Sequence, residues 1–354
     1  MNVILVIDCG TTNLRVTAVD ETGAVLSSAK AEGGVRHTAI DGHNGRLRSA
    51  LSECIASALA QCGAQAQEVS RCVAYGMITS NMGLLEIPHV AAPASAQKLR
   101  EAMRTERFED IAPFPIEFIP GVRNFAGPVD MENFGAMDMM RGEETEAVGL
   151  YGLLAPKGEA VFVLPGSHNK FVRMGEEGDI LGCMTSISGE LLDAVTHHTI
   201  LADAVNRSFV SDAAYDADMA REGAWACAQS GLGRAAFAGR ILSTLGGKSA
   251  AQVQSYLLGV TLALDVQALW DVLPSRPVEM EKTGAALGPS AALGVAPDAQ
   301  AMECPRIFVA GKPPVQQAMC DVMDALGMEG AQPVPQEISA RMGLCGALRI
   351  ALER

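Results

Sequence analysis

Two short polar turns in the sequence carry groups that could bind phosphate. Each follows a β-branched apolar run, at residues 3–7 and at residues 160–164. The residues concerned are Asp8, Gly10, Thr11, Thr12, Asn13 and Arg15 in the first turn, and Gly166, Ser167, His168, Asn169 and Lys170 in the second. Successive backbone N–H groups and hydroxyls suit phosphate oxygens, and a carboxylate such as that of Asp8 can hold a hydrated Mg²⁺. A single turn of this kind could equally be an ordinary hairpin, but two at corresponding places favour a clamp for nucleotide phosphates.

The two turns belong to a longer repeat in which a strand, a turn, a second strand, a turn and a third strand follow one another. The first copy covers residues 3–27 and the second covers residues 160–186, so that Gly166 lies 156 positions after Gly10, close to half of the 354 residues. Two copies of one opening, each leading into helix-like segments, predict a duplicated α/β architecture. We therefore expect a first domain at 1–155 and a second at 156–354, with the two turns facing each other across a cleft.

Hydrophobic periodicity predicts the elements that must position these turns. The expected helices are 46–61, 191–201 and 255–272, with a helix-rich segment at 212–230, and the expected buried strands are 73–77 and 306–310. Six prolines punctuate residues 88–128, which predicts loops and short strands there.

Composition and charge exclude several classes of protein. Apolar residues make up 49% of the chain and charged residues 19%, which is typical of a globular protein and not of a disordered one. The net charge of −14 provides no global basic field to attract nucleic acid or an anionic membrane, so neither is expected as a partner. Any phosphate site must be built locally.

The location of the protein is predicted from its termini, apolar runs and cysteines. The first residues lack a basic segment and reach an acid after a short apolar run, unlike a signal peptide. The longest apolar stretch, 256–270, is interrupted by Asp265 and is shorter than the ~20 residues that cross a bilayer. The nine cysteines are scattered without a Cys-x-x-Cys pair, which favours reduced thiols. We expect a cytoplasmic protein.

The first turn, Asp8-Cys9-Gly10-Thr11-Thr12-Asn13-Leu14-Arg15, resembles the first phosphate loop of the ATP-using superfamily that includes actin, hexokinase and the heat-shock chaperone ATPases. Further segments, at 76–83, 140–145, 164–170 and 188–191, resemble in order the blocks of the 2-dehydro-3-deoxygalactonokinase family. This resemblance covers nearly the whole chain. It implies two ribonuclease-H-like domains with an actin-like ATPase fold. It also implies phosphorylation of the C6 hydroxyl of 2-keto-3-deoxy-galactonate with ATP and Mg²⁺, a step of galactonate catabolism.

The sequence departs from the family at two places. Cys9 stands where the family usually has Trp, and Gly311-Lys312-Pro313-Pro314 replaces a glycine followed by small hydroxyl residues near the adenosine. By resemblance Gly311 belongs to the adenosine loop. Prolines there remove N–H donors and restrict φ, so nucleotide affinity and base preference are the features these changes would affect first.

Phosphoryl transfer to a hydroxyl needs a carboxylate that accepts the alcohol proton. The segment Arg141-Gly142-Glu143-Glu144 resembles a Gly-x-Glu-Glu segment of the exopolyphosphatases in the same superfamily, so Glu143 or Glu144 is the expected base. The alternative is that one of the two begins a helix, where negative charge suits the helix dipole, and only the other meets the substrate. We favour Glu143, with Asp138 and Glu190 as competitors.

The substrate implied by the resemblance is a small sugar acid, whose carboxylate must be bound by a cation. Arg123 and Arg141 are the candidates because a guanidinium matches a carboxylate bidentately, although either could be a solvated surface arginine. Ser80 and Asn81 offer donors and acceptors for sugar hydroxyls, or could instead cap a helix.

Other functions are compatible with part of the pattern. The gluconate epimer or another sugar could replace the galactonate, and the altered loop at 311–314 is compatible with a nucleotide-gated binding protein that has lost the chemistry. A phosphatase of the exopolyphosphatase type would need a long basic channel, which 27 basic residues against 41 acidic ones disfavour. The sequence leaves the oligomeric state open, and a homodimer is compatible with it.

Overall fold

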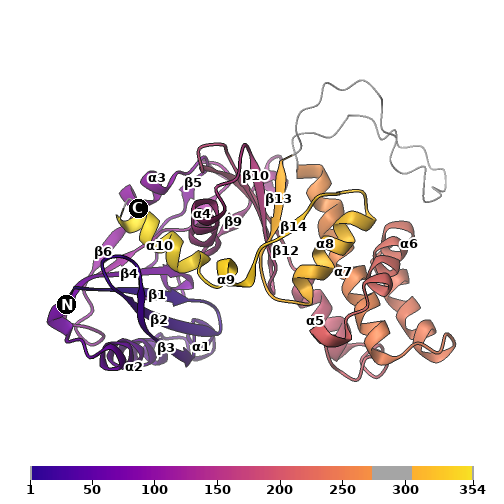
Figure 1. Ribbon diagram of the computed structural model, residues 1–354, viewed down its shortest axis with the longest axis horizontal. Coiled ribbons are helices and arrows are strands. Elements are labelled where there is room, and N and C mark those ends of the chain that lie inside the picture. Colours follow the sequence, from indigo (N-terminus) through magenta and orange to yellow (C-terminus); the bar gives the residue numbers. More distant parts are fainter. Residues whose placement is uncertain (1, 273–304, 353–354) are drawn as a thin grey trace. The chain divides into compact units, whose positions relative to one another are not determined.

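A computed structural model describes residues 2–272 and 305–352 (Figure 1). The chain divides into two compact units, described separately below. The first comprises 1–159, 172–183 and 337–354, and the second comprises 160–171 and 184–336. Segment 273–304, and with it Cys304, lies outside the described residues; the other eight cysteines are free thiols.

The first unit is built on a six-stranded mixed sheet with the order β3-β2-β1-β4-β7-β6. These strands are β1 (Val3–Cys9), β2 (Asn13–Val19), β3 (Val25–Glu32), β4 (Val69–Gly76), β6 (Arg104–Glu106) and β7 (Ile116–Phe118). The first three are antiparallel neighbours, whereas β4 runs parallel to β1 and β7 parallel to β4. A smaller sheet contains β5 (Val90–Ala91), β8 (Val122–Arg123) and β9 (Met139–Met140).

Strand β1 lies in the centre of this sheet because nearly every one of its side chains is apolar and buried. Its register places Asp8 opposite Arg15 on β2 and opposite Tyr75 on β4, and places Cys9 opposite Gly76. Since β1 and β4 are parallel, the ends that carry Asp8 and Gly76 meet at one edge of the sheet. The first polar turn starts at this edge.

Helices cover the six-stranded sheet. Helix α2 (Gly45–Cys62) buries Leu47, Leu51, Cys54, Ile55, Ala58 and Leu59, which recur at helical spacing, and packs against β2 and β3. Helix α10 (Met342–Leu352) contacts β1 and β4 (Figure 1). The remaining helices of this unit are α1 (Arg36–Asp41), α3 (Ala96–Glu101) and α4 (Glu143–Leu154), with single turns η1 (Ala66–Glu68), η2 (Met77–Thr79) and η3 (Phe134–Ala136).

Helices α4 and α10 pack with their backbones in close approach. A Cβ atom on Gly346 would lie 1.8 Å from the carbonyl oxygen of Thr145, and one on Gly149 would lie 1.9 Å from that of Met342. Gly343 leaves room in the same way for the hydroxyl of Tyr75. Because only glycine permits these approaches, the position of α4 depends on α10.

The second unit contains strands of a five-stranded sheet with the order β12-β11-β10-β13-β14. These are β10 (Ala160–Leu164), β11 (Asn169–Met174), β12 (Ile180–Ser186), β13 (Arg306–Val309) and β14 (Gln332–Pro333), of which residues 172–183 count with the first unit. Strand β13 runs parallel to β10 and to β14. In each sheet the three strands of one predicted repeat are followed by two strands added in parallel, and in the first sheet β6 then pairs antiparallel with β7.

In the described part of the second unit the helices are α5 (Ser188–His198), α6 (Ala217–Thr244), α7 (Ala250–Val272) and α8 (Val315–Ala325), with the single turn η4 (Asp212–Ala214). Helix α7 contacts α5, α6 and α8. Side chains of α7 such as Leu257, Val260 and Val266 join β10 residues in the core of this unit. The backbone of helix α6 is not helical at Gly231. Helix α9 (Gln336–Ser339) spans the boundary at which the residue range of the second unit ends and that of the first resumes.

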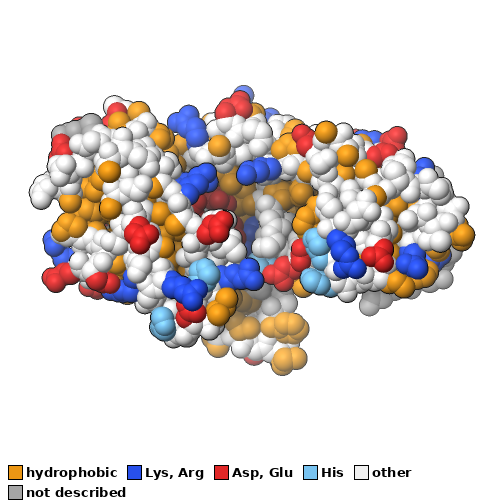
Figure 2. Space-filling model, turned by 90° about the horizontal axis from the view of Figure 1, so that it is seen from below, with side chains coloured by type: hydrophobic (Ala, Val, Ile, Leu, Met, Phe, Trp, Pro, Cys, Tyr) orange, Lys and Arg blue, Asp and Glu red, His pale blue; other side chains and the backbone are white. Residues whose placement is uncertain are grey.

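The predicted elements largely agree with the structure. Both predicted three-stranded openings, the three helices and the two buried strands are present, with ends shifted by a few residues, and the mixed α/β class is confirmed. The proline-rich stretch contains one short helix, α3, besides its short strands. None of the helices in the described ranges has the length and apolarity needed to span a membrane. Acidic and basic side chains are interspersed over the face in Figure 2.

Candidate functional site

The first polar turn leaves two backbone N–H groups free. The N–H of Gly10 donates to the carbonyl of Asn13 at 2.9 Å, which closes the hairpin. Within residues 2–272 and 305–352, no group accepts a hydrogen bond from the N–H of Thr11 or Thr12, and both residues are exposed. The turn can therefore donate to an anion.

The carbonyl groups of this turn are occupied by the segment that follows β3. Gly33, Val35 and Arg36 donate their N–H groups to Thr12, Gly10 and Thr11, at distances of 3.0, 3.3 and 2.8 Å in that order. These bonds hold the carbonyl oxygens, which would repel an anion, against the protein.

The second turn has the same arrangement. The N–H of Gly166 donates to Oδ1 of Asn169 at 2.9 Å, and the carbonyl of Ser167 accepts from the N–H of Glu190 at 3.1 Å. The N–H groups of Ser167 and His168 have no acceptor among the described residues. His168 pairs through Nε2 with Glu190 at 3.0 Å, beside the turn.

A glycine supports each turn from behind. A Cβ on Gly34 would lie 2.1 Å from the carbonyl oxygen of Gly10, and a Cβ on Gly189 would lie 2.1 Å from that of Gly166. Sequence reasoning did not single out Gly34. The signal was available, because in each copy of the repeat a glycine follows the third strand, two residues before α1 in the first copy and at the second residue of α5 in the second.

Asp8 lies where the turn leaves β1, half-buried between two partners. Burial raises the pKa of its carboxyl, while the charge of Arg15 and a hydrogen bond with the hydroxyl of Tyr75 lower it. Both partners are on the neighbouring strands, opposite Asp8. The sheet register alone therefore brings Arg15 to the carboxylate, whereas the sequence pattern predicts Arg15 as a cation for phosphate.

The two glutamates of the motif at 141–144 have different environments. Glu144 is fully buried, and its carboxylate accepts from the N–H of Gly142 at 2.7 Å and from Oγ1 of Thr145 at 3.0 Å. Glu143 is only half-buried and accepts from the N–H of Arg141 at 3.1 Å. Glu144 thus holds the start of α4 in the way the sequence suggested for one of the pair.

A third glutamate, Glu146, belongs to the same cluster and was not singled out from the sequence. Burial raises its pKa well above the ordinary range, and the charges of Glu143, Asp8 and Glu144 raise it further. The cluster forms because α4 begins beside the edge of the sheet, where a Cβ on Gly142 would lie 3.3 Å from Cα of Gly76. Helical spacing from Glu143 was the available signal, since residues three apart share a face.

The guanidinium of Arg141 is occupied by protein groups. Nη1 donates to the carbonyl and to Oγ1 of Thr79, both at 2.6 Å, and Nη2 donates to the carbonyl of Ile87 at 2.9 Å. Nη2 also lies 3.2 Å from Nε2 of His89. In this geometry Arg141 fixes the loop between β4 and β5, although the sequence placed it against the substrate carboxylate.

Arg123 on β8 is available for an anion. It is half-buried, its buried Nε has no hydrogen-bond partner, and no ion pair involves it within the described residues. Of the two neutral candidates, Ser80 donates through Oγ to the carbonyl of Met77 at 2.7 Å, whereas Asn81 is exposed. Asp138, a competitor for the base, accepts from the N–H of Met139 at 2.6 Å.

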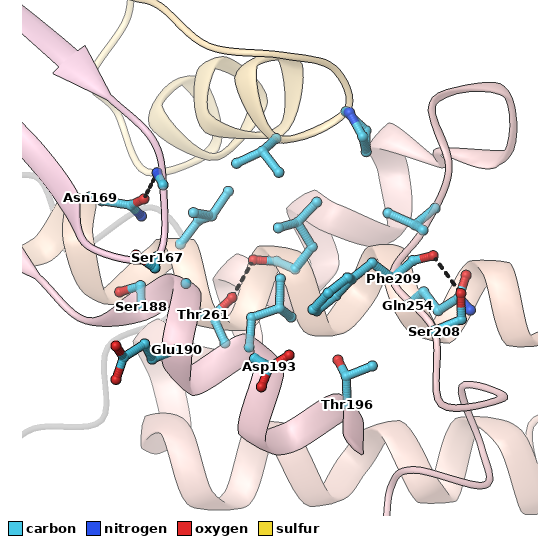
Figure 3. A pocket seen from close by; sticks show the side chains of 18 residues that line it. Ser167, Asn169, Ser188, Glu190, Asp193, Thr196, Ser208, Phe209, Gln254 and Thr261 are labelled. Carbon is cyan, nitrogen blue, oxygen red and sulfur yellow. Dashed lines mark hydrogen bonds between the residues drawn. The ribbon is translucent and has the colours of Figure 1, made fainter. Parts of the chain in front are cut away.

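A cavity of about 490 Å³ opens next to the second turn, entirely within the second unit. One side carries polar groups of the turn and of the start of α5, namely Ser167, Asn169, Ser188 and Glu190 (Figure 3). The walls are mainly apolar and come from Leu192, Phe209, Val210, Leu258, Leu262 and Val315. Apolar walls with a few polar groups are typical of a small-molecule site.

Two further polar side chains, Gln254 and Asp193, also line the cavity. Gln254 donates to the carbonyl of Val205 at 2.8 Å, and Asp193 pairs with Nδ1 of His197 at 3.0 Å. The ring of His197 packs edge-on against Phe209, with centroids 5.1 Å apart (Phe209 is labelled in Figure 3). His197 therefore supports one wall of the cavity.

The other predicted nucleotide ligands of the second unit lie around the turn. Lys170 is buried and its Nζ donates to Oγ1 of Thr185 at 2.5 Å, so this cation is partly engaged. Gly311 has a φ of 108°, and a Cβ there would lie 3.3 Å from Cδ of Pro165, which precedes the turn. Pro314 lines the cavity and Lys312 is exposed. No group of three or more His, Cys, Asp or Glu residues in the described ranges could hold a metal ion by itself.

These features place the chain in a class: α/β proteins with mixed sheets whose hairpin turns can bind nucleotide phosphates. The chain belongs to the 2-keto-3-deoxy-galactonokinase family, whose model matches residues 8–285. The resemblance found in the sequence is therefore confirmed.

Two curated relatives carry the name of this family. The Rhizobium meliloti (strain 1021) protein named "Probable 2-dehydro-3-deoxygalactonokinase DgoK1" is 28% identical over 208 residues, which are 56% of this chain and 58% of that protein. The 2-dehydro-3-deoxygalactonokinase of Escherichia coli (strain K12) is 26% identical over 272 residues, or 75% of this chain and 80% of that protein.

A solved structure has the same fold. It is the crystal structure of a Sinorhizobium meliloti protein described as a candidate 2-dehydro-3-deoxygalactonokinase, with a TM-score of 0.70 and 22% identity. The match covers 99% of this chain and 100% of that one. At this identity the likeness concerns the fold.

The buried carboxyl of Glu144 predicts a pH dependence of stability. Burial, together with the charge of Glu143, raises its pKa to about 8, above the value of about 4.3 for an unfolded chain. Between these values the folded state binds more protons than the unfolded state, so the contribution of Glu144 to stability falls as pH rises. Glu144→Gln is neutral throughout and can still accept from Gly142. We expect the free energy of unfolding of the wild type, relative to Glu144→Gln, to decrease by about 1 kcal/mol per pH unit from about pH 5.5 to about pH 8.

Urea denaturation at several pH values measures this difference. Glu53→Gln is the control, because Glu53 is exposed on α2 and its replacement should leave the pH dependence of the wild type unchanged. Parallel pH profiles for the wild type and Glu144→Gln would show that Glu144 does not titrate as stated.

Proposed function

We propose that this chain transfers the γ-phosphoryl group of ATP to the C6 hydroxyl of 2-keto-3-deoxy-galactonate. The observation that carries the proposal is the pair of equivalent turns, each with two free N–H groups and each supported by a glycine, in a chain of this kinase family. Free N–H groups in such turns donate to phosphate oxygens. The gluconate epimer differs at one hydroxyl and is the alternative substrate.

The two units correspond, in this proposal, to two ribonuclease-H-like domains of an actin-like ATPase fold, predicted as 1–155 and 156–354. The corresponding strand orders of the two sheets support this assignment. The first domain binds the sugar acid. It also binds phosphate, at Gly10, Thr11, Thr12, Asn13 and Arg15. The second binds phosphate at Gly166, Ser167, His168 and Lys170, and holds the nucleoside in the cavity lined by Phe209 and Leu258, next to Gly311.

A magnesium ion would be held by Asp8 together with the phosphates of ATP and water. The donor set fits, because Mg²⁺ is usually bound by one or two carboxylates and substrate phosphates, and Asp8 is the carboxylate beside the free N–H groups. When bound, the ion would neutralise developing charge on the phosphates. Tyr75 orients Asp8 by hydrogen bonding to its carboxyl.

Glu143 is the proposed base. Its partial exposure leaves it able to accept the alcohol proton, whereas the carboxylate of Glu144 is enclosed and serves the start of α4. Glu190 is paired with His168 and Asp138 is bonded to backbone, which makes them weaker candidates.

Arg123 binds the carboxylate of the sugar acid in this proposal. Its unpartnered, half-buried guanidinium supports the role, because a buried donor without an acceptor is costly unless a ligand satisfies it. Arg141 acts indirectly by holding the loop that carries Ser80 and Asn81, the groups proposed to contact sugar hydroxyls.

The proposed reaction is tested by measuring ADP formation from Mg-ATP with purified protein. We expect turnover with 2-keto-3-deoxy-galactonate that exceeds turnover with its gluconate epimer, with neutral hexoses and without sugar. Turnover only with the epimer would transfer the assignment to that substrate. Binding of ATP without turnover on any sugar would contradict the kinase and favour a nucleotide-gated binding protein.

The assignment of the base predicts different effects for the two adjacent glutamates. Glu143→Gln should lower kcat by a factor of about 10² to 10⁴, because an amide cannot accept the alcohol proton, while the affinity for ADP stays close to that of the wild type. Glu144→Gln is the matched control and should keep kcat within a few-fold. A normal kcat for Glu143→Gln would move the role of the base to another carboxylate.

The carboxylate assignment predicts a change in KM. Arg123→Ala should raise KM for the sugar acid by about tenfold or more and leave KM for ATP nearly unchanged, since it removes a charge-assisted bond to one substrate only. Arg104→Ala, at an exposed position on β6, is the control. An increase confined to KM for ATP would place Arg123 on the phosphate side.

A further inference from the structure

A buried carboxylate lies in the middle of the most apolar helix of the second unit. Asp265 on α7 is 0% exposed, although its neighbours along the helix are core residues. A carboxylate in such a place is strongly unfavourable unless hydrogen bonds satisfy it. Its partners therefore indicate why the chain retains it.

Asp265 is bonded to both segments that build the second polar turn. Oδ2 accepts from Nδ2 of Asn169 at 2.6 Å, and Oδ1 accepts from Oγ of Ser188 at 2.5 Å. Asn169 is the last residue of the turn, and Ser188 is the first residue of α5, whose Gly189 and Glu190 support the turn from behind. One side chain thus ties α7 to the turn and to its support.

The bond to Asn169 also decides which way its amide faces. A carboxylate only accepts hydrogen bonds, so the NH₂ group of Asn169 must point toward Asp265 and its Oδ1 must point away. That Oδ1 accepts the N–H of Gly166 at 2.9 Å and so closes the turn. In the first turn a backbone carbonyl, that of Asn13, does the same for Gly10.

The shape of the second turn therefore depends on a side-chain relay from Asp265 through Asn169 to Gly166. The N–H groups that this shape leaves free among the described residues are those of Ser167, which lines the cavity, and of His168 (Ser167, Asn169 and Ser188 are labelled in Figure 3). If the amide of Asn169 turned over, its NH₂ group would face the N–H of Gly166 and the turn would open.

We propose that Asp265 is a positioning residue for the nucleotide: by fixing the amide of Asn169 it holds the second turn in the shape that binds phosphate. The proposal rests on the proposed function, in which this turn binds the phosphates of ATP. Asp265 itself does not touch the nucleotide and acts through Asn169 and Ser188.

Affinity for Mg-ADP in a double-mutant cycle tests the relay. Asp265→Ala and Asn169→Ala should each raise the Kd for Mg-ADP about tenfold, because each disconnects Gly166 from its support. The double variant should bind no more weakly than the weaker single variant, since both changes break one chain of bonds. KM for ATP should rise in parallel, while KM for the sugar acid stays within about twofold.

Ser255→Ala is the matched control. Ser255 is also buried on α7 and bonded on both sides, to the N–H of Asp216 at 3.0 Å and to the carbonyl of Ala251 at 2.9 Å, but it is not bonded to the turn. It should lower stability without raising the Kd for Mg-ADP. An increase equal to that of Asp265→Ala would show a general loosening of α7 and overturn the proposal.

Two further results would also overturn it: unchanged affinity in a folded Asp265→Ala protein, or additive effects in the cycle. If Asp265→Ala does not fold, Asn169→Ala decides alone, and unchanged affinity for Mg-ADP then rejects the relay. A wild type that binds Mg-ADP but phosphorylates no sugar acid would refute the proposed reaction while leaving the relay to be judged by the cycle. A wild type that does not bind Mg-ADP would refute both.

Discussion

The rest of the site depends on how the carbonyl groups of two tight turns are held. In each turn a glycine just beyond the third strand, Gly34 or Gly189, lets a second backbone segment approach so closely that it takes up turn carbonyls. The adjacent N–H groups are then left without acceptors among the residues that the structure describes, in a chain whose net charge is −14. A protein with an excess of acids can thus bind a polyanion, because the donors are fixed backbone dipoles and need no basic surface.

The acidic cluster at the start of α4 has the opposite electrostatic character, because it brings several carboxyl groups together. Burial raises the pKa of Glu144 and of Glu146, and the charge of Glu143 raises both further, so the buried members cannot all be charged. Burial of Glu144 is tolerated because it satisfies the N–H of Gly142, where the chain has a φ of 113° and the helix needs an acceptor. The unfavourable burial of the Glu144 carboxyl therefore accompanies the placement of the start of α4 against Gly76.

The sequence predicted those features that depend on residues close together in the chain. Glycines, hydroxyls and amides between apolar runs indicated both polar turns, and helical spacing indicated α2, α5 and α7. The sequence could not predict hydrogen bonds between residues far apart in the chain. Arg141 donates to Thr79, 62 positions away, and Asn169 donates to Asp265, 96 positions away. A sequence pattern shows that Asp265 interrupts an apolar run, but only the packing of α7 against the turn shows what satisfies it. The roles of Glu143, Arg123, Ser80 and Asn81 stay predictions, since no substrate defines them.

The packing of α4 on α10 has a consequence for how the protein is made. Helix α4 carries the acidic cluster, and Gly149 and Gly346 set its distance from α10, which is translated nearly two hundred residues later. While the ribosome synthesises the second unit, the first therefore lacks one of its layers and exposes apolar surface of α4. The second unit, whose residues 184–336 are continuous, can complete its core earlier. In newly made chains the core of the second unit should thus form before the packing that fixes the acidic cluster.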